Sequence, residues 1–165
     1  MAVQRAPVPA DALISGYANG SNHVDAYRVA VPATVPLSEY ITAFFQTPLF
    51  RMERTLLSAI GRVPSDADQI EALALGKGSE MAAWKEEART ETEILLAVSG
   101  APIRTWLSTE GGAQPALWFG SVALTHNGKL PFAVSALMPV HALYSRMLLA
   151  SAARALRAAP HLSAR

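Results

Sequence analysis

Two side chains in this sequence are suited to proton transfer, His141 and Glu53. His141 borders the apolar stripe of an expected C-terminal helix, and a histidine there can act as a general acid or base. Glu53 falls in the apolar arc of an expected helix that begins at Pro48, where an unpaired carboxylate would be costly or would keep its proton. Its expected partner is His141, Arg28 or Arg104. The competing interpretations are structural: a hydrogen bond from the histidine to a backbone carbonyl, and a salt bridge at the glutamate.

The segment from Trp84 to Arg89 is expected to be a strand with one solvent face. Strict alternation puts Trp84, Glu86 and Ala88 on one face and Lys85, Glu87 and Arg89 on the other. The second set is the solvent face, so Glu86 should point with Trp84 toward a helix or a cavity. The same rule places Arg104 on the side of Trp106 in a later strand.

These two pairs of a tryptophan and a charged residue define a candidate ligand site. If both face inward, Glu86 and Arg104 form a partly buried ion pair under Trp84 and Trp106, which would anchor an elongated or aromatic ligand. Tyr144, in the apolar arc of the expected C-terminal helix, completes the predicted ligand-binding set. The alternative assignment leaves Arg104 and Trp106 outside and turns three other side chains of that strand inward, Ile103, Thr105 and Leu107.

Other site chemistries lack their motifs. The four histidines, at 23, 126, 141 and 161, have no second histidine or carboxylate at metal-binding spacing. The stretch "GKGSE" at 76–80 does not match a phosphate-binding loop, and no dinucleotide or hydrolase motif is present. The absence of cysteine excludes disulfides, thiolate metal sites and a cysteine nucleophile. The sequence therefore predicts no metal site and no cofactor.

Composition places the chain among single-domain globular proteins. It has 165 residues, 51% of them apolar and 16% charged, with a net charge of +1. This balance argues against disorder and against nucleic acid as a partner. No signal-peptide core and no run of about 18 apolar residues is present, so we expect a cytoplasmic protein without a membrane span. The expected division is an N-terminal arm over 1–22, one domain over 23–159 and a tail over 160–165.

The elements that must position these residues follow from β-branched runs, helical periodicity and turn residues. The segment 130–139 is compatible with a last strand or with a helical lead-in. The expected elements are a strand at 24–32, helices at 38–46, 48–60 and 65–76, strands at 80–89, 93–99, 102–109 and 116–125, and a helix from Pro139 to a point before Pro160.

Three residues are expected to set the helix ends. Thr47 is a favourable N-cap, and Pro48 then takes the first helical position, where its missing N–H costs nothing. Inside a helix the same proline would cost about 3 kcal/mol. Gly76 is expected to end the third helix.

This order of elements predicts an α+β fold in which a curved antiparallel sheet wraps around a long C-terminal helix, with short helices between the first and second strands. The segments "VDAYRVAVP", "ITAFFQTPLFRMERTLL", "MAAWKEEARTETEILLAVSG", "RTWLS", "LWFGSVAL" and "HALYSRMLLASAARAL" together resemble a bacterial family of unknown function in the START-like, or polyketide-cyclase-like, helix-grip superfamily. The resemblance covers 24–158. It implies an internal cavity for a hydrophobic small molecule and no particular reaction.

We therefore expect the function to be binding of a hydrophobic small molecule in an internal cavity. The first alternative is an enzyme of the cyclase or dehydratase kind, with His141 and Glu53 as its proton-transfer groups. The second is a non-catalytic interaction domain that docks through a sheet edge or through the arm 1–22. A homodimer is a further candidate assembly.

Overall fold

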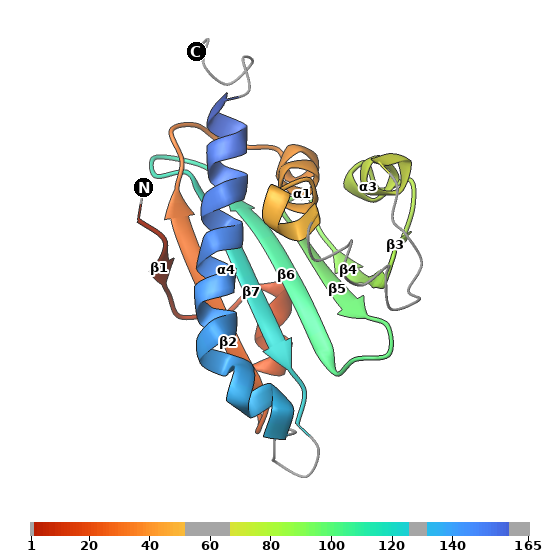
Figure 1. The fold of residues 1–165 in the computed structure, drawn as a ribbon. Coiled ribbons are helices and arrows are strands. Elements are labelled where there is room, and N and C mark those ends of the chain that lie inside the picture. The colour runs from red at the N-terminus through yellow and green to blue at the C-terminus, as the bar shows by residue number, and fades with distance from the viewer. Residues whose placement is uncertain (1, 52–66, 126–131, 159–165) are drawn as a thin grey trace.

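A computed structural model describes residues 2–51, 67–125 and 132–158 of the chain, without the side chains of 132–139 (Figure 1). Within these ranges it is an α+β protein, in which a seven-stranded antiparallel sheet carries a long C-terminal helix on one face. The elements are β1 (Gln4–Arg5), the 3-10 helix η1 (Leu13–Tyr17), β2 (His23–Ala30), α1 (Leu37–Phe45), α3 (Ala67–Ala74), β3 (Glu80–Met81), β4 (Trp84–Arg89), β5 (Glu93–Val98), β6 (Ile103–Glu110), β7 (Ala116–Ala123) and α4 (Phe132–Ala158).

The sheet places its first long strand beside its last one. The order is β1-β2-β7-β6-β5-β4-β3, and each neighbouring pair is antiparallel. Strands β3 to β7 follow each other as a meander, whereas β2 pairs with β7 over its full length. This long-range pairing sets Asp25 directly opposite Ser121.

Two helix ends agree with the sequence prediction. The Thr47 hydroxyl accepts the backbone N–H of Phe50 at 3.2 Å, and the chain is helical again from Pro48. Gly76 follows α3 with a φ of +67°, a conformation that glycine adopts without strain. The start of α1 differs slightly, because its N-cap is Pro36 and Ser38 lies in the first turn.

Two other elements differ from expectation. The strand expected over 80–89 is divided into β3 and β4, because Ala82 has a left-handed φ of 52° and the chain turns there. Helix α4 begins at Phe132, so Pro139 lies inside the helix and not at its first position. An interior proline removes one backbone hydrogen bond of the helix, and the helix continues through it.

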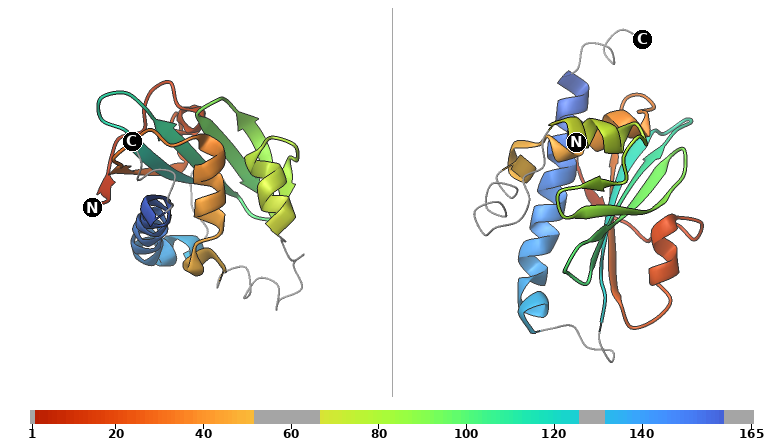
Figure 2. Two further views of the ribbon diagram at one scale, coloured as in Figure 1. Left: turned by 90° about the horizontal axis from the view of Figure 1, so that it is seen from above. Right: turned by 90° about the vertical axis from the view of Figure 1, so that its right-hand side faces the viewer.

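Both faces of the sheet are covered. Helices α1, α3 and α4 lie on one face, which we call the helix face, and η1 lies on the other, the outer face (Figure 2). The segment expected to be an arm, 1–22, thus supplies an edge strand and the cover of the outer face. Its Ile14 is fully buried there, in a small core with Trp106 and Leu95.

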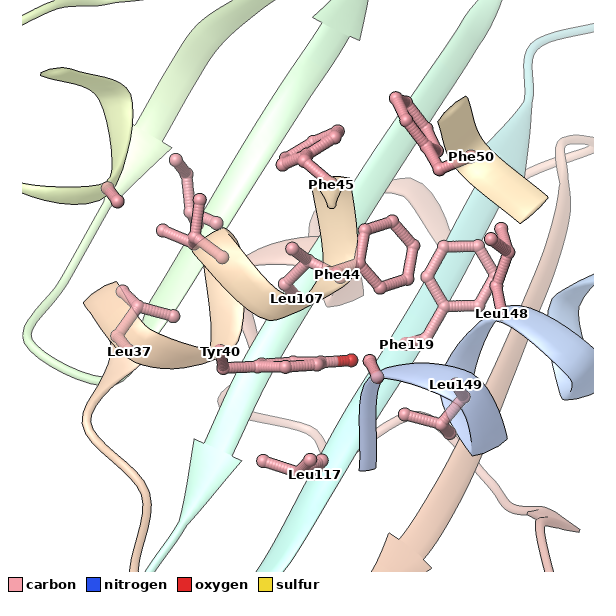
Figure 3. Packing of buried hydrophobic residues seen from close by; sticks show 14 of the residues in the cluster. Leu37, Tyr40, Phe44, Phe45, Phe50, Leu107, Leu117, Phe119, Leu148 and Leu149 are labelled. Carbon is pink, nitrogen blue, oxygen red and sulfur yellow. The ribbon is translucent and has the colours of Figure 1, made fainter. Parts of the chain in front are cut away.

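The larger core fills the helix face near α1 with aromatic rings (Figure 3). Phe44 stacks on Phe119 of β7 with ring centroids 5.3 Å apart, and Phe50 packs against Trp84 of β4 at 5.0 Å. Phe45 meets Phe50 edge to face at 4.8 Å. Such pairs contribute about 1 kcal/mol each beyond their burial, so this end of the sheet is firmly closed.

Candidate functional site

A row of polar side chains crosses the helix face from β2 to β6. Asp25, Ser121 and Thr105 are direct cross-strand neighbours, so all three point to the same side of the sheet. His141 reaches this row from α4, and its Nε2 lies 2.8 Å from the Ser121 hydroxyl oxygen. We call Asp25, Ser121 and His141 the Asp25 cluster.

Asp25 is a buried carboxylate held by hydroxyl groups. It is 3% exposed, its Oδ1 accepts the Ser121 hydroxyl at 2.6 Å, and its Oδ2 accepts the Tyr27 hydroxyl at 3.2 Å. Within the part of the chain that the structure describes, its ion-pair partner is His141, whose Nε2 is 3.8 Å from Oδ2. A buried carboxylate without a permanent cation beside it is costly, which indicates a role beyond packing.

The buried charge also affects Tyr27. Burial, the charge of Asp25 and the hydrogen bond to Asp25 together raise the pKa of Tyr27 above its ordinary value. The charges of Arg5 and Arg146 oppose this rise, and the Arg146 guanidinium lies 5.7 Å from the centre of the Tyr27 ring. The hydroxyl of Tyr27 therefore stays protonated and remains a donor to Asp25.

Helix α4 holds His141 over the polar row. Ser145, one turn further along and fully buried, donates its hydroxyl hydrogen to the His141 carbonyl at 2.8 Å, and its oxygen lies 3.3 Å from Nε2. The His141 side chain is 31% exposed, whereas that of Asp25 is 2% exposed. The Asp25 cluster thus links a buried charge to a partly exposed imidazole at the border of the core.

The cluster does not have the geometry of a serine hydrolase. In a hydrolase triad the serine and the carboxylate bind opposite nitrogens of the histidine. Here Ser121 and Asp25 both lie nearest to Nε2 of His141, and Ser121 gives its hydrogen to Asp25. Ser121 is therefore a bridge between the carboxylate and the imidazole, and not an activated nucleophile.

Thr105 extends the row toward Trp84. The indole N–H of Trp84 donates to the Thr105 hydroxyl oxygen at 3.4 Å, while the ring itself packs on Phe45 and Phe50. Trp84, a predicted ligand-binding residue, therefore lies on the helix face where the polar row meets the aromatic core.

Glu86 shares the face of Trp84 as predicted, but its partner is different. A β-bulge between Glu86 and Ala88 shifts the register, so Arg89 turns to the helix face and Ala88 to the outer face, the reverse of strict alternation. Arg89 pairs with Glu86 at 2.9 Å and donates to the Leu73 carbonyl of α3 at 2.6 Å. The hydrogen bond from Arg89 to Leu73 joins α3 to the sheet, and the ion pair with Glu86 positions the guanidinium for it.

The predicted ion pair between Glu86 and Arg104 does not form, because Arg104 lies on the outer face. Its Nε is 2.6 Å from the Glu87 carboxylate, which also accepts the hydroxyl of Tyr17 from η1. Arg104 also lies over the Tyr17 ring, at 5.8 Å from its centre. These contacts hold η1 on the sheet.

Trp106 shares the outer face with Arg104, as the alternative assignment of this strand predicted, and yet it is buried. It is 1% exposed because η1 covers it, and its indole N–H donates to Glu93 at 2.8 Å. The same Glu93 oxygen accepts the backbone N–H of Leu13 at 2.8 Å. Sequence reasoning treated the side away from the helices as solvent, and the N-terminal segment makes it a second core.

The remaining predicted residues divide between the core and the undescribed part of the chain. Tyr144 is partly buried and packs against the larger core. Glu53 lies outside the described residues, so its predicted pairing with His141 has no structural counterpart here. Arg28, another expected partner of Glu53, instead pairs with Glu110 at 3.0 Å.

Sequence reasoning missed Asp25 and Ser121. Asp25 gave a usable signal, because it is the acidic residue of β2 and shares the alternation of Tyr27 and Val29, which are buried. Ser121 gave none by itself. Its role comes from the pairing of β2 with β7, which no local pattern reveals.

Two surface grooves lie away from the Asp25 cluster, whereas a third, of ≈ 360 Å³, is lined by residues 5–8 and 24–26 and so touches Asp25. One, with a volume of ≈ 600 Å³, is lined by Val3, Leu49 and residues of α4 that include Met147. Another, of ≈ 470 Å³, is lined by residues of α1, α3 and the end of α4. Both are alternative places for a ligand and serve as comparisons for the Asp25 cluster.

Within the described ranges, no helix combines the length and the apolar character needed to cross a bilayer, and no three His, Cys, Asp or Glu side chains gather as they would around a metal ion. A fold does not fix a function, so the chemistry of the site indicates what the protein can do. A comparison of the chain with protein-family models, with curated proteins and with solved structures finds no match in any of the three.

Proposed function

We propose that this protein binds an apolar small molecule on the helix face of its sheet, beside the Asp25 cluster. The observation that carries the proposal is a buried carboxylate, Asp25, joined to a partly exposed imidazole, His141, inside a largely apolar interface. Small-molecule sites are typically apolar with a few convergent polar groups. The helix-grip architecture implied by the sequence resemblance and the cytoplasmic location belong to the same proposal.

The two ends of the helix face support this position for the ligand. Near α1 the space is taken by large rings, among them Phe44 and Phe119. The row of the Asp25 cluster carries the smaller side chains of Ser121 and Thr105, and Ala123 lies two residues beyond Ser121 on the same face. We place the ligand at this end because small side chains take up less of the space between sheet and helix.

The polar groups of this end would orient the ligand and contribute little to its burial. His141 offers a ring that can donate or accept a hydrogen bond, and Thr105 adds a hydroxyl. Asp25 is too buried to meet a ligand directly, and holds Ser121 and His141 in place.

Fluorescence titration with N-phenyl-1-naphthylamine, an uncharged apolar probe, tests the proposal. Ala123→Trp introduces a large ring next to the Asp25 cluster and should weaken probe binding about tenfold or more, which corresponds to about 1.4 kcal/mol. Ala97→Trp is the matched control, because Ala97 pairs with Arg104 and lies on the outer face. It should leave the dissociation constant within about twofold of wild type.

The outcomes separate the possible locations. Equal weakening by Ala97→Trp and Ala123→Trp would reject the helix face as the site. Failure of the wild-type protein to bind the probe would overturn the proposal and favour the interaction-domain class, with a homodimer as its simplest form. Unfolding midpoints of both variants show that each is folded under the conditions of the titration.

A further inference from the structure

The directions of the hydrogen bonds in the Asp25 cluster determine where its hydrogens lie. A carboxylate only accepts, so Ser121 uses its single hydroxyl hydrogen on Asp25 Oδ1 at 2.6 Å. It has no second hydrogen for His141, and therefore Nε2 must be the donor in the 2.8 Å contact between them. Ser145 likewise gives its hydrogen to the His141 carbonyl, which agrees with a hydrogen on Nε2. In the neutral ring, Nδ1 then carries the lone pair.

Protonation of that lone pair would create an imidazolium beside a buried carboxylate. Asp25 Oδ2 lies 3.8 Å from Nε2, and little water surrounds it because Asp25 is 3% exposed. The carboxylate therefore lies where it would face the positive charge that forms on the ring during proton transfer. Among the described residues, the charged and titratable groups of this neighbourhood include Tyr27, which donates to Asp25, Arg5 and Arg146, which both act on Tyr27, and His23, two residues before Asp25 on the same strand face.

The His141 ring is held in a fixed orientation, and part of it is accessible to solvent. Contacts with Ser121 and Ser145 limit its rotation, while 31% of the side chain remains exposed. A base must be held in a fixed orientation and must reach the molecule it acts on. His141 meets both conditions, whereas Asp25 meets only the first.

We infer that His141 is a general base for a carbon acid, an apolar small molecule whose C–H bond is activated by a neighbouring carbonyl or comparable group. The inference rests on the proposed function, because the molecule must bind beside the Asp25 cluster. In the step, the C–H bond breaks, its electron pair stays on the molecule, and the proton forms an N–H bond at Nδ1. Return of the proton to another atom of the same molecule completes an isomerisation, which requires no oxidant, reductant or co-reactant.

The ring opening of 5-nitrobenzisoxazole tests this step with a defined probe. A base removes the C–H proton of its five-membered ring, the electron pair forms a nitrile, and the N–O bond breaks to release a coloured phenolate. Wild-type protein should accelerate the reaction over buffer, and His141→Gln should lower the rate constant about tenfold or more. Glutamine still offers a donor to Ser121 but is not a base. Asp25→Asn should give an intermediate loss, because the imidazolium loses its neighbouring charge.

Two controls make the outcomes decisive. His23→Gln replaces the other histidine of the described residues, which lies on β2 opposite Ala123, and should lower the rate much less than His141→Gln does. Binding of N-phenyl-1-naphthylamine is measured for every variant. If His141→Gln keeps the wild-type rate, or if His23→Gln loses as much, the base is not His141 and the inference fails, while intact probe binding leaves the proposed function standing. If wild type binds no probe, both fail.

Discussion

The carboxylates on the two faces of the sheet differ in the kind of group that binds them. On the outer face, Glu87 pairs with the Arg104 guanidinium and the Tyr17 hydroxyl, and Glu93 binds the indole N–H of Trp106. Burial lowers the pKa of Arg104, but the hydrogen bonds and charges of Tyr17 and Glu87 outweigh this and raise it, so the guanidinium stays charged. The hydrogen bonds and the ion pair of these two carboxylates hold η1 on the outer face.

On the helix face, the partners of Asp25 among the described residues are hydroxyl groups and a histidine, and not an arginine or a lysine. A histidine changes its charge within the physiological pH range, whereas an arginine does not. The Asp25 cluster thus holds its carboxylate with hydroxyl groups and an imidazole, whereas the outer face uses a guanidinium. The faces thus differ in both burial and partner: Asp25 is 3% exposed, whereas Glu93 is only partly buried and Glu87 is exposed, and the type of partner separates a structural carboxylate from a candidate functional one.

Loss of the Glu93 carboxylate should have the largest effect on stability. Glu93→Ala leaves the indole N–H of Trp106 and the backbone N–H of Leu13 without their acceptor under η1. We expect a loss of about 3 kcal/mol in the free energy of unfolding, measured by urea denaturation. Glu91→Ala, at an exposed position in the preceding turn, should cost less than about 0.5 kcal/mol. Similar losses in the two variants would show that the outer face is not fastened through Glu93.

Adding a methyl group at Gly120, which is tightly packed against Trp106, should have the next largest effect on the free energy of unfolding. A Cβ on Gly120 would lie 2.8 Å from Cε3 of Trp106 and 2.9 Å from Cδ1 of Ile14, closer than these buried groups can accept. Gly120→Ala should therefore cost about 2 kcal/mol by urea denaturation. Gly16→Ala is the control, since a Cβ there meets nothing within 4 Å. An unchanged midpoint for Gly120→Ala would mean that η1 packs more loosely than the contacts indicate.

The substitution Tyr40→Phe tests how tightly the aromatic end of the helix face is packed. Burial raises the pKa of Tyr40 well above its ordinary value, and its hydroxyl donates to the Trp118 carbonyl at 2.9 Å. Tyr40→Phe should cost about 1 kcal/mol near neutral pH. As pH rises through about 10, Tyr40 ionises in the unfolded chain and stays protonated in the folded one, so wild type loses stability that the variant keeps. The difference between the two proteins should shrink from about pH 8 to about pH 11, and a constant difference would contradict the burial of this hydroxyl.

Asp25 should show the smallest effect on stability. Asp25→Asn removes a costly buried charge while its amide oxygen can still accept the Ser121 hydroxyl, so we expect a change below about 1 kcal/mol of either sign. Measured beside Glu93→Ala by the same urea denaturation, this variant sharpens the comparison of the two faces. A loss of unfolding free energy as large as that of Glu93→Ala would show that Asp25 has mainly a structural role.

The sequence allowed most elements to be predicted, because their signals are local. The cap at Thr47 and the glycine at 76 act within one turn of chain, and the meander from β4 to β7 follows from alternating runs and turns. The bulge between Glu86 and Ala88 escaped prediction since it depends on the register with β5. It reversed the face of Arg89 and changed the partner of Glu86.

The candidate site was predictable only in part, for a related physical reason. His141 stood out because its chemistry is visible at one position. Its partners Asp25 and Ser121 come from strands that pair across 96 positions of sequence, which local periodicity cannot reveal. The placement of Arg104 and Trp106 likewise depends on η1, whose covering of the outer face has no periodic signal.

The most direct test of the central claim is an NMR titration of isotope-labelled protein with N-phenyl-1-naphthylamine, following backbone amides and histidine ring signals. We expect the largest shift changes at Ser121, Thr105 and the His141 ring, with little change at Arg104. Changes centred instead on Val3 and Met147, which line the groove beside α4, or on the outer face would contradict the assignment of the Asp25 cluster as the ligand site.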